Sequence, residues 1–87
     1  MVRSHIIFTG RVQGVGFRYT AQRLANEQKL LGWVKNLPDG RVELMAEGPQ
    51  AKIEHLIFKL NSQFQITKQD IDWLNPKGQF TGFEVTY

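Results

Sequence analysis

The segment GRVQGVGFR, residues Gly10–Arg18, lies between an apolar run and a helical pattern and holds three glycines within seven residues. Glycine loses more conformational freedom on folding than any other residue, so this cluster indicates a backbone that turns tightly or approaches another group closely. Before it, apolar and polar residues alternate from His5 to Val12, as in a half-buried strand. After it, apolar residues recur on one side of a helix that starts at Phe17. The segment therefore connects a strand to a helix.

A hairpin and a second helix are predicted next. The strands 33–36 and 42–46 flank LPDG, residues 37–40, whose proline and glycine are typical of a tight turn. Gly48-Pro49 starts the helix, because proline is tolerated in a first turn where its missing N–H is not needed. The apolar stripe of this helix consists of Ile53, Leu56, Ile57 and Leu60.

Alternation over residues 67–73 and 83–87 predicts strands in the last part of the chain, and Ile66 is out of phase, which indicates a bulge or a late start. The order is read as strand, helix, strand, strand, helix, strand. It predicts an α+β ferredoxin-like split βαβ sandwich, in which two helices pack on one face of an antiparallel sheet. We expect residues 1–87 to form one such domain.

The crossover of the first βαβ unit is expected to be right-handed, so the first strand and strand 33–36 run parallel and end at one edge of the sheet. The returning strand lies between them, which separates their axes by about 10 Å. The glycine-rich connection and Asn36 therefore face each other across a gap that fits a small phosphate compound and a water. Asn36 has an alternative interpretation as a turn-forming residue before Leu37.

Charge and composition restrict the partners. The formal net charge is +3, and the Lys and Arg residues are scattered singly, a pattern that favours a small anion over nucleic acid. The absence of cysteine excludes a disulfide scaffold, a thiolate nucleophile and a Cys-based metal site. No segment approaches the ~20 apolar residues of a membrane span, and the N-terminus lacks the apolar core of a signal peptide. We expect a cytoplasmic protein without a membrane partner.

The connection itself predicts an anion site. A helix N-terminus offers unpaired N–H groups and a partial positive charge, and upstream glycines let further amides turn inward. Arg18 in the first helical turn adds a planar cation that matches phosphate oxygens. Neither a nucleotide P-loop nor a dinucleotide fingerprint fits these residues. The alternative is that the glycines only make a tight connection and that Arg18 is solvated.

At this point two segments resemble a known family. GRVQGVGFR together with GWVKNLPDGRVELMAEG resembles both signature segments of the acylphosphatases, small ferredoxin-like enzymes that hydrolyse the carboxyl–phosphate mixed anhydride. The resemblance implies that Arg18 completes a phosphate site and that Asn36 positions the attacking water. It also implies phosphate binding by the backbone amides of Gln13, Gly14, Val15, Gly16, Phe17 and Arg18.

The same resemblance implies a small acyl phosphate as substrate and inorganic phosphate as product and competitive ligand. We expect no metal, no cofactor and a monomer. Two positions depart from the family pattern: Phe8 replaces a smaller aliphatic residue, and Lys29 replaces a glycine that ends the first helix. A non-glycine residue at positive φ costs roughly 1 kcal/mol there.

Other residues and other classes of protein fit the sequence less well. His5 and His55 are expected at the surface rather than in catalysis. Trp33 and Met45 are expected on the sheet face away from the helices, as a partly open apolar patch. An RNA-binding module of the same fold needs exposed aromatic residues on its central strands, and the strand RVELMAE has none. A catalytically idle regulatory or metal-handling domain is the remaining alternative.

Overall fold

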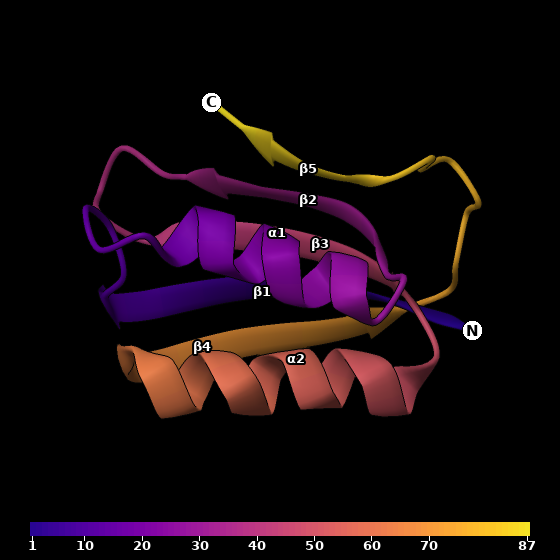
Figure 1. The fold of residues 1–87 in the computed structure, drawn as a ribbon, viewed down its shortest axis with the longest axis horizontal. Coiled ribbons are helices and arrows are strands. Elements are labelled where there is room, and N and C mark those ends of the chain that lie inside the picture. The colour runs from indigo at the N-terminus through magenta and orange to yellow at the C-terminus, as the bar shows by residue number, and fades with distance from the viewer.

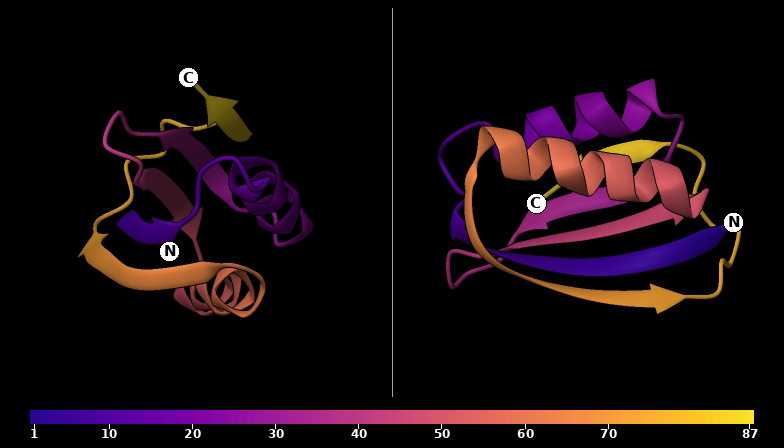
Figure 2. Two further views of the ribbon diagram at one scale, coloured as in Figure 1. Left: turned by 90° about the vertical axis from the view of Figure 1, so that its left-hand side faces the viewer. Right: turned by 90° about the horizontal axis from the view of Figure 1, so that it is seen from below.

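Two helices cover one face of a five-stranded sheet in the computed structural model, which describes residues 1–87 (Figure 1). The second panel of Figure 2 shows both helices on the same side of the sheet. The fold class expected from the sequence is therefore confirmed. The elements are β1 (Val2–Arg11), α1 (Phe17–Glu27), β2 (Leu31–Asn36), β3 (Val42–Gly48), α2 (Gln50–Gln63), β4 (Gln65–Leu74) and β5 (Phe83–Thr86).

The strand order is β4-β1-β3-β2-β5. As expected, β3 lies between β1 and β2 and pairs antiparallel with both. Two corrections concern the end of the chain. The predicted order has six elements, whereas the structure has seven. The last part of the chain forms two separate strands, β4 and β5, which lie at opposite edges of the sheet. In addition, β5 pairs parallel with β2, so the sheet is mixed rather than wholly antiparallel.

The core lies between the sheet and the helices. Every second residue of β1 and β3 points into the core, as in a sheet that is buried on one face. The apolar stripes of α1 and α2 point into it from the other side, so both helices are amphipathic. Phe17 packs between Phe8 and Phe64, with ring centroids 5.2 and 4.9 Å away. The buried hydrophobic side chains are Ile6, Phe8, Val12, Phe17, Ala21, Leu24, Ala25, Leu30, Val34, Val42, Leu44, Ala46, Ile53, Leu56, Ile57, Leu60 and Phe83.

The irregularity expected near Ile66 is a bulge. The pairing of β1 with β4 shifts register between Thr9 and Gly10, which leaves Thr67 as the extra residue. Gly10 has φ 137°, and a Cβ there would collide with the backbone carbonyl of Gln65. The first glycine of the opening segment is thus needed for the close approach of β4.

The first helix ends with a lysine in a left-handed conformation. Lys29 has φ 58°, its N–H donates to the carbonyl of Asn26, and the N–H of Leu30 donates to the carbonyl of Ala25. These two bonds make a Schellman motif, in which glycine is the usual residue at the left-handed position. The expected departure from the family pattern at Lys29 therefore coincides with a positive φ.

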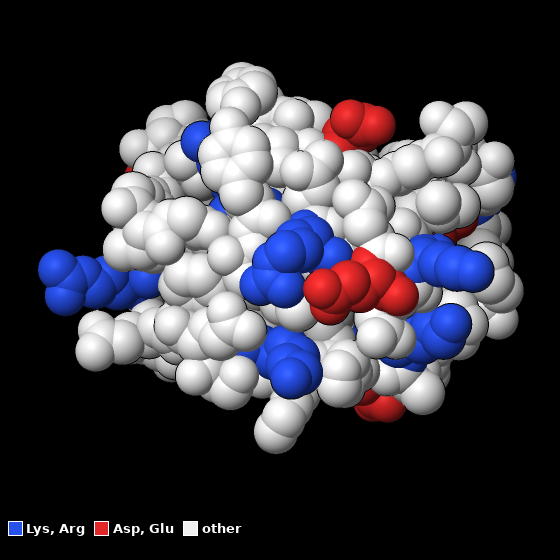
Figure 3. Space-filling model, viewed as in Figure 1, with Lys and Arg blue, Asp and Glu red and all other residues white.

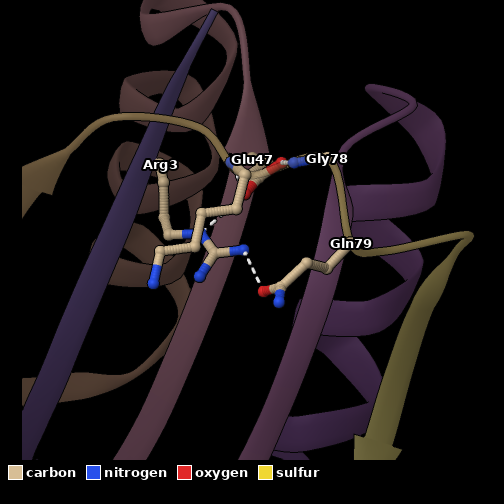
Figure 4. Close-up of polar contacts among 5 residues, drawn as sticks. Arg3, Glu47, Gly78 and Gln79 are labelled. Atoms are coloured by element: carbon tan, nitrogen blue, oxygen red, sulfur yellow. Dashed lines mark hydrogen bonds and ion pairs between the residues drawn. The ribbon is translucent and has the colours of Figure 1, made fainter.

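The connection from β4 to β5, residues 75–82, is fastened to the sheet by a buried ion pair (Figure 4). The Nε of Arg3 donates to the Oε2 of Glu47 at 2.6 Å, and both residues are buried. Glu47 also accepts from the backbone N–H groups of Lys77 and Gly78, at 2.9 and 3.2 Å, and Arg3 donates to Gln79 at 3.2 Å. The N–H of Lys77, aided by Arg3, lowers the pKa of Glu47. This network is at the end of the sheet away from the segment Gly10–Arg18.

The open face of the sheet carries Trp33 and Met45 as cross-strand partners, both half-buried, as expected. His5 is the fourth residue of β1 rather than its first, and its ring lies 2.6 Å from the carboxylate of Glu43. His55 is exposed on α2. On the face that bears the helices, Lys and Arg side chains are separated by other residues and form no continuous basic surface (Figure 3). Neither α1 nor α2 has the length and apolar character that crossing a membrane requires.

Candidate functional site

The glycine loop, residues 12–16, joins β1 to α1 at the end of the sheet where β2 and β5 also end (Figure 1). Gly14 and Gly16 have φ 72° and 80°, and a Cβ at either position would meet no atom within 4 Å. Lack of space is therefore not the reason for glycine at these positions. Glycine is required by the left-handed backbone conformation, because an L side chain destabilises it.

Backbone N–H groups of the loop and of the first helical turn have no backbone partners. The first hydrogen bond of α1 runs from Thr20 N–H to the carbonyl of Gly16, and no N–H from residue 13 to residue 19 donates to a backbone carbonyl. Gly16 is the N-cap and supplies no side-chain acceptor. These donors, with the partial positive charge of the helix N-terminus, suit an anion.

Gln13 and Phe17 hold the loop in place through their side chains. The Nε2 of Gln13 donates to the carbonyls of Leu37 and Arg41, at 2.8 and 2.9 Å, and so ties the loop to the turn between β2 and β3. Phe17 anchors the start of α1 in the core. Both side chains are thus committed to structure, and only their backbone amides are left for a ligand.

The turn that receives Gln13 is itself reinforced. Asp39 accepts from the backbone N–H of Arg41 at 3.2 Å and from its Nε at 2.8 Å. These contacts, the backbone bond first, lower the pKa of Asp39. The turn therefore holds two carbonyls in fixed positions for the Gln13 amide.

Arg18 is held by neutral groups alone. Its Nη1 donates to the carbonyl of Thr86 at 3.3 Å, and its guanidinium carbon lies 4.8 Å from the ring centroid of Tyr87. None of the six ion pairs in the molecule includes Arg18. Its positive charge is oriented without being compensated, and it is therefore available to an anion.

Asn36 is the last residue of β2, and its Oδ1 is buried without a hydrogen-bond partner in the protein. Most buried polar atoms are paired, so such an acceptor marks a place where a water or a ligand can donate. Asn36 lies in the wall of a cavity of about 210 Å³. The other lining residues are Val12, Gly14, Gly16, Phe17, Arg18 and Tyr19.

The structure thus brings five of the seven candidate residues to one cavity, while Gln13 and Val15 do not line it. Sequence reasoning missed Tyr19, Thr86 and Tyr87. Tyr19 follows Arg18 directly and was within reach of the motif, whereas nothing local links residues 86 and 87 to the loop. The cavity wall contains no carboxylate and no histidine, and no group of three or more His, Asp or Glu side chains is placed to hold a metal ion.

Comparison with known proteins matches nearly the whole chain to one family. The family model described as Acylphosphatase matches residues 4–85. A protein named acylphosphatase from Methylococcus capsulatus is 43% identical over 88 residues, which span 98% of this chain and 96% of that protein. Another from Roseiflexus sp. is 37% identical over 90 residues, which span 100% and 97%.

Solved structures of the same name share the fold. The crystal structure of acylphosphatase from Bacillus subtilis superposes with a TM-score of 0.94 at 38% identity and covers 100% of both chains. The structure of an acylphosphatase from Coxiella burnetii superposes with a TM-score of 0.89 at 33% identity, over 98% of this chain and 92% of that one.

Proposed function

Because this chain belongs to the acylphosphatase family of hydrolases, we propose that it hydrolyses the carboxyl–phosphate bond of small acyl phosphates to a carboxylate and inorganic phosphate. One observation carries the proposal: a single cavity is lined by residues whose backbone N–H groups have no backbone partner, by Arg18 with its uncompensated guanidinium, and by Asn36, whose buried Oδ1 has no partner in the protein. Its volume of about 210 Å³ is enough for a phosphoryl group and a water, whose share of liquid volume is about 30 Å³.

The phosphoryl group sits on the loop amides and Arg18 in this mechanism. Negative charge on its equatorial oxygens is stabilised by donors that are already oriented, so little reorganisation is needed when the bond breaks. Arg18 meets this requirement because its neutral contacts leave the guanidinium charge free.

Asn36 orients the water that attacks phosphorus. An amide side chain both accepts and donates hydrogen bonds but does not take a proton at neutral pH, so its contribution is positioning. The water oxygen bonds to phosphorus, and a water proton moves to a phosphate oxygen of the substrate. No protein base is required, in keeping with a cavity wall that lacks histidine and carboxylate.

The departing group is a carboxylate, which leaves with the electron pair of the broken P–O bond and needs no general acid. The positive charge at the phosphoryl oxygens comes from Arg18 and the amides, so the mechanism uses no metal and no cofactor.

Hydrolysis of benzoyl phosphate tests the proposal. We expect Arg18→Gln to lower kcat/KM by about 10³-fold or more, the scale of an arginine that contacts a transferring phosphoryl group. Arg23→Gln is the matched control, because Arg23 lies on the same helix and pairs with Glu27 in an exposed position. Its kcat/KM should stay within about twofold of the wild type. Equal activity of the Arg18→Gln variant and the wild type would contradict the proposal.

A further inference from the structure

Arg18 approaches the cavity from α1, but the contacts that orient it come from the far end of the chain. The carbonyl of Thr86 accepts from its Nη1 at 3.3 Å, and the ring of Tyr87 lies 4.8 Å from its guanidinium carbon. A cation within about 6 Å of an aromatic centroid is attracted by the ring face. Residue 18 is therefore held by two residues 68 and 69 positions away in the sequence.

Strand pairing explains how these residues arrive there. β5 runs parallel to β2 with Lys35 opposite Thr86, so the residues that follow this pair, Asn36 and Tyr87, lie at the same end of the sheet. Because β2 ends near the glycine loop, its pairing with β5 also brings Tyr87 to that end of the sheet.

Tyr87 is exposed, at 86%, and its side chain makes two contacts, one with the guanidinium of Arg18 and one with Tyr19. Its hydroxyl lies 2.7 Å from the hydroxyl of Tyr19, a residue that lines the cavity. This hydrogen bond raises the pKa of Tyr87, while the charge of Arg18 acts in the opposite direction. The phenol therefore stays neutral at neutral pH and does not neutralise the guanidinium.

We propose that Tyr87 is a positioning residue for Arg18, and that the hydroxyl pair with Tyr19 keeps its ring against the guanidinium. A flexible arginine loses side-chain freedom when it binds phosphate, and contacts that restrict it beforehand reduce that loss. A carboxylate would restrict it too, but would also cancel its charge. The ring face and the Thr86 carbonyl orient Arg18 and leave the charge for the ligand. The inference rests on the proposed function, since it assigns Arg18 to phosphate.

Two measurements test it: hydrolysis of benzoyl phosphate and the binding of inorganic phosphate by calorimetry. We expect Tyr87→Leu to weaken phosphate binding about tenfold and to lower kcat/KM about tenfold, because the guanidinium of Arg18 loses its orientation. The unfolding midpoint in urea should not change. Tyr87→Phe retains the ring and should restore both to within about threefold of the wild type. Phe58→Leu is the matched control, because Phe58 is an exposed aromatic residue on α2 that does not line the cavity.

Double variants separate positioning from a general effect on the fold. Tyr19→Phe and Tyr87→Phe each remove the same hydroxyl pair, so the double variant should be no worse than either single one. In an Arg18→Gln background the ring has lost its cation, and Tyr87→Leu should cause no further loss of kcat/KM.

The inference is wrong if Tyr87→Leu behaves as Phe58→Leu does, or if its effect on kcat/KM persists undiminished in the Arg18→Gln background. A wild-type protein that binds phosphate but does not hydrolyse benzoyl phosphate would overturn the proposed function instead. In that case the calorimetric comparison of phosphate binding by the wild type and the Tyr87→Leu variant still tests the role of Tyr87.

Discussion

Asn36 is the residue whose replacement separates binding from chemistry. It ends β2 and lines the cavity, and its Oδ1 is buried without a hydrogen-bond partner in the protein. We expect Asn36→Ala to lower kcat by about 100-fold, the usual cost of losing alignment of a reacting group. KM and the inhibition constant for phosphate should change far less, because the loop amides and Arg18 remain.

Steady-state kinetics with benzoyl phosphate measure this difference, and Asn26→Ala, an exposed substitution on α1, is the control. A fully active Asn36→Ala variant would remove the water-orienting role.

Lys29 tests the cost of a left-handed residue at a helix end. Its φ of 58° is needed for the two hydrogen bonds that close α1. Lys29→Gly should raise the free energy of unfolding by about 1 kcal/mol, since the steric cost of a Cβ at that φ disappears. Lys29→Ala removes the same charge but keeps the Cβ, so it should not stabilise the protein. Urea unfolding compares the two variants, and equal stability of both would refute the explanation.

Among the elements, β5 is the shortest strand, and contacts outside its own sequence hold the segment that precedes it. It has four residues, and the connection before it is held by Arg3 and Glu47 at the opposite end of the sheet (Figure 4). The ion pair therefore helps to fix β5, the strand that ends at Thr86 and is followed by Tyr87, beside Arg18.

This network predicts how stability depends on pH. The folded-state pKa of Glu47 is lowered below its ordinary value of 4.5, so its contribution is fully present above pH 4.5 and is lost as the pH falls through the folded-state pKa. We expect the free energy of unfolding to decrease with acidification in this range and Glu47→Gln to reduce that decrease.

At neutral pH the Glu47→Gln variant should be less stable by about 3 kcal/mol or more, because Arg3 is left as an uncompensated buried charge. Urea unfolding at a series of pH values measures both effects. Glu84→Gln, an exposed substitution on β5, is the control. The same pH dependence in the Glu47→Gln variant and the wild type would show that Glu47 is not responsible.

For the molecule as a whole, the cavity couples ligand binding to folding. Residues from the glycine loop, α1 and β2 form it only in the folded chain, so inorganic phosphate should stabilise the protein by about 2.7 kcal/mol at 100 times its Kd. For a domain of this size that raises Tm by roughly 10 to 20 °C. Thermal unfolding with increasing phosphate measures the shift, which the Arg18→Gln variant should lack.

Phosphate should also compete with benzoyl phosphate, and a chelator such as EDTA should leave the activity intact. Strict dependence on a divalent ion would contradict the mechanism.

Much of this protein was predictable from short-range patterns. The alternation of β1, the stripes of α1 and α2 and the glycines at their boundary each involve neighbouring residues, so the sequence alone indicated the fold class and the loop. It also singled out Arg18 and Asn36, which the structure brings to one cavity, while their roles in catalysis stay predictions.

The sequence by itself determined the elements, their amphipathic faces and the residues expected to meet phosphate, because periodicity and turn chemistry act over a few residues. Only the tertiary structure decided that β5 lies parallel to β2, that Gln13 binds the far turn and that Tyr87 lies against Arg18. Those contacts join residues 24 to 69 positions apart. They depend on strand register and on where the buried Arg3–Glu47 pair fixes the last connection, and no local pattern encodes either.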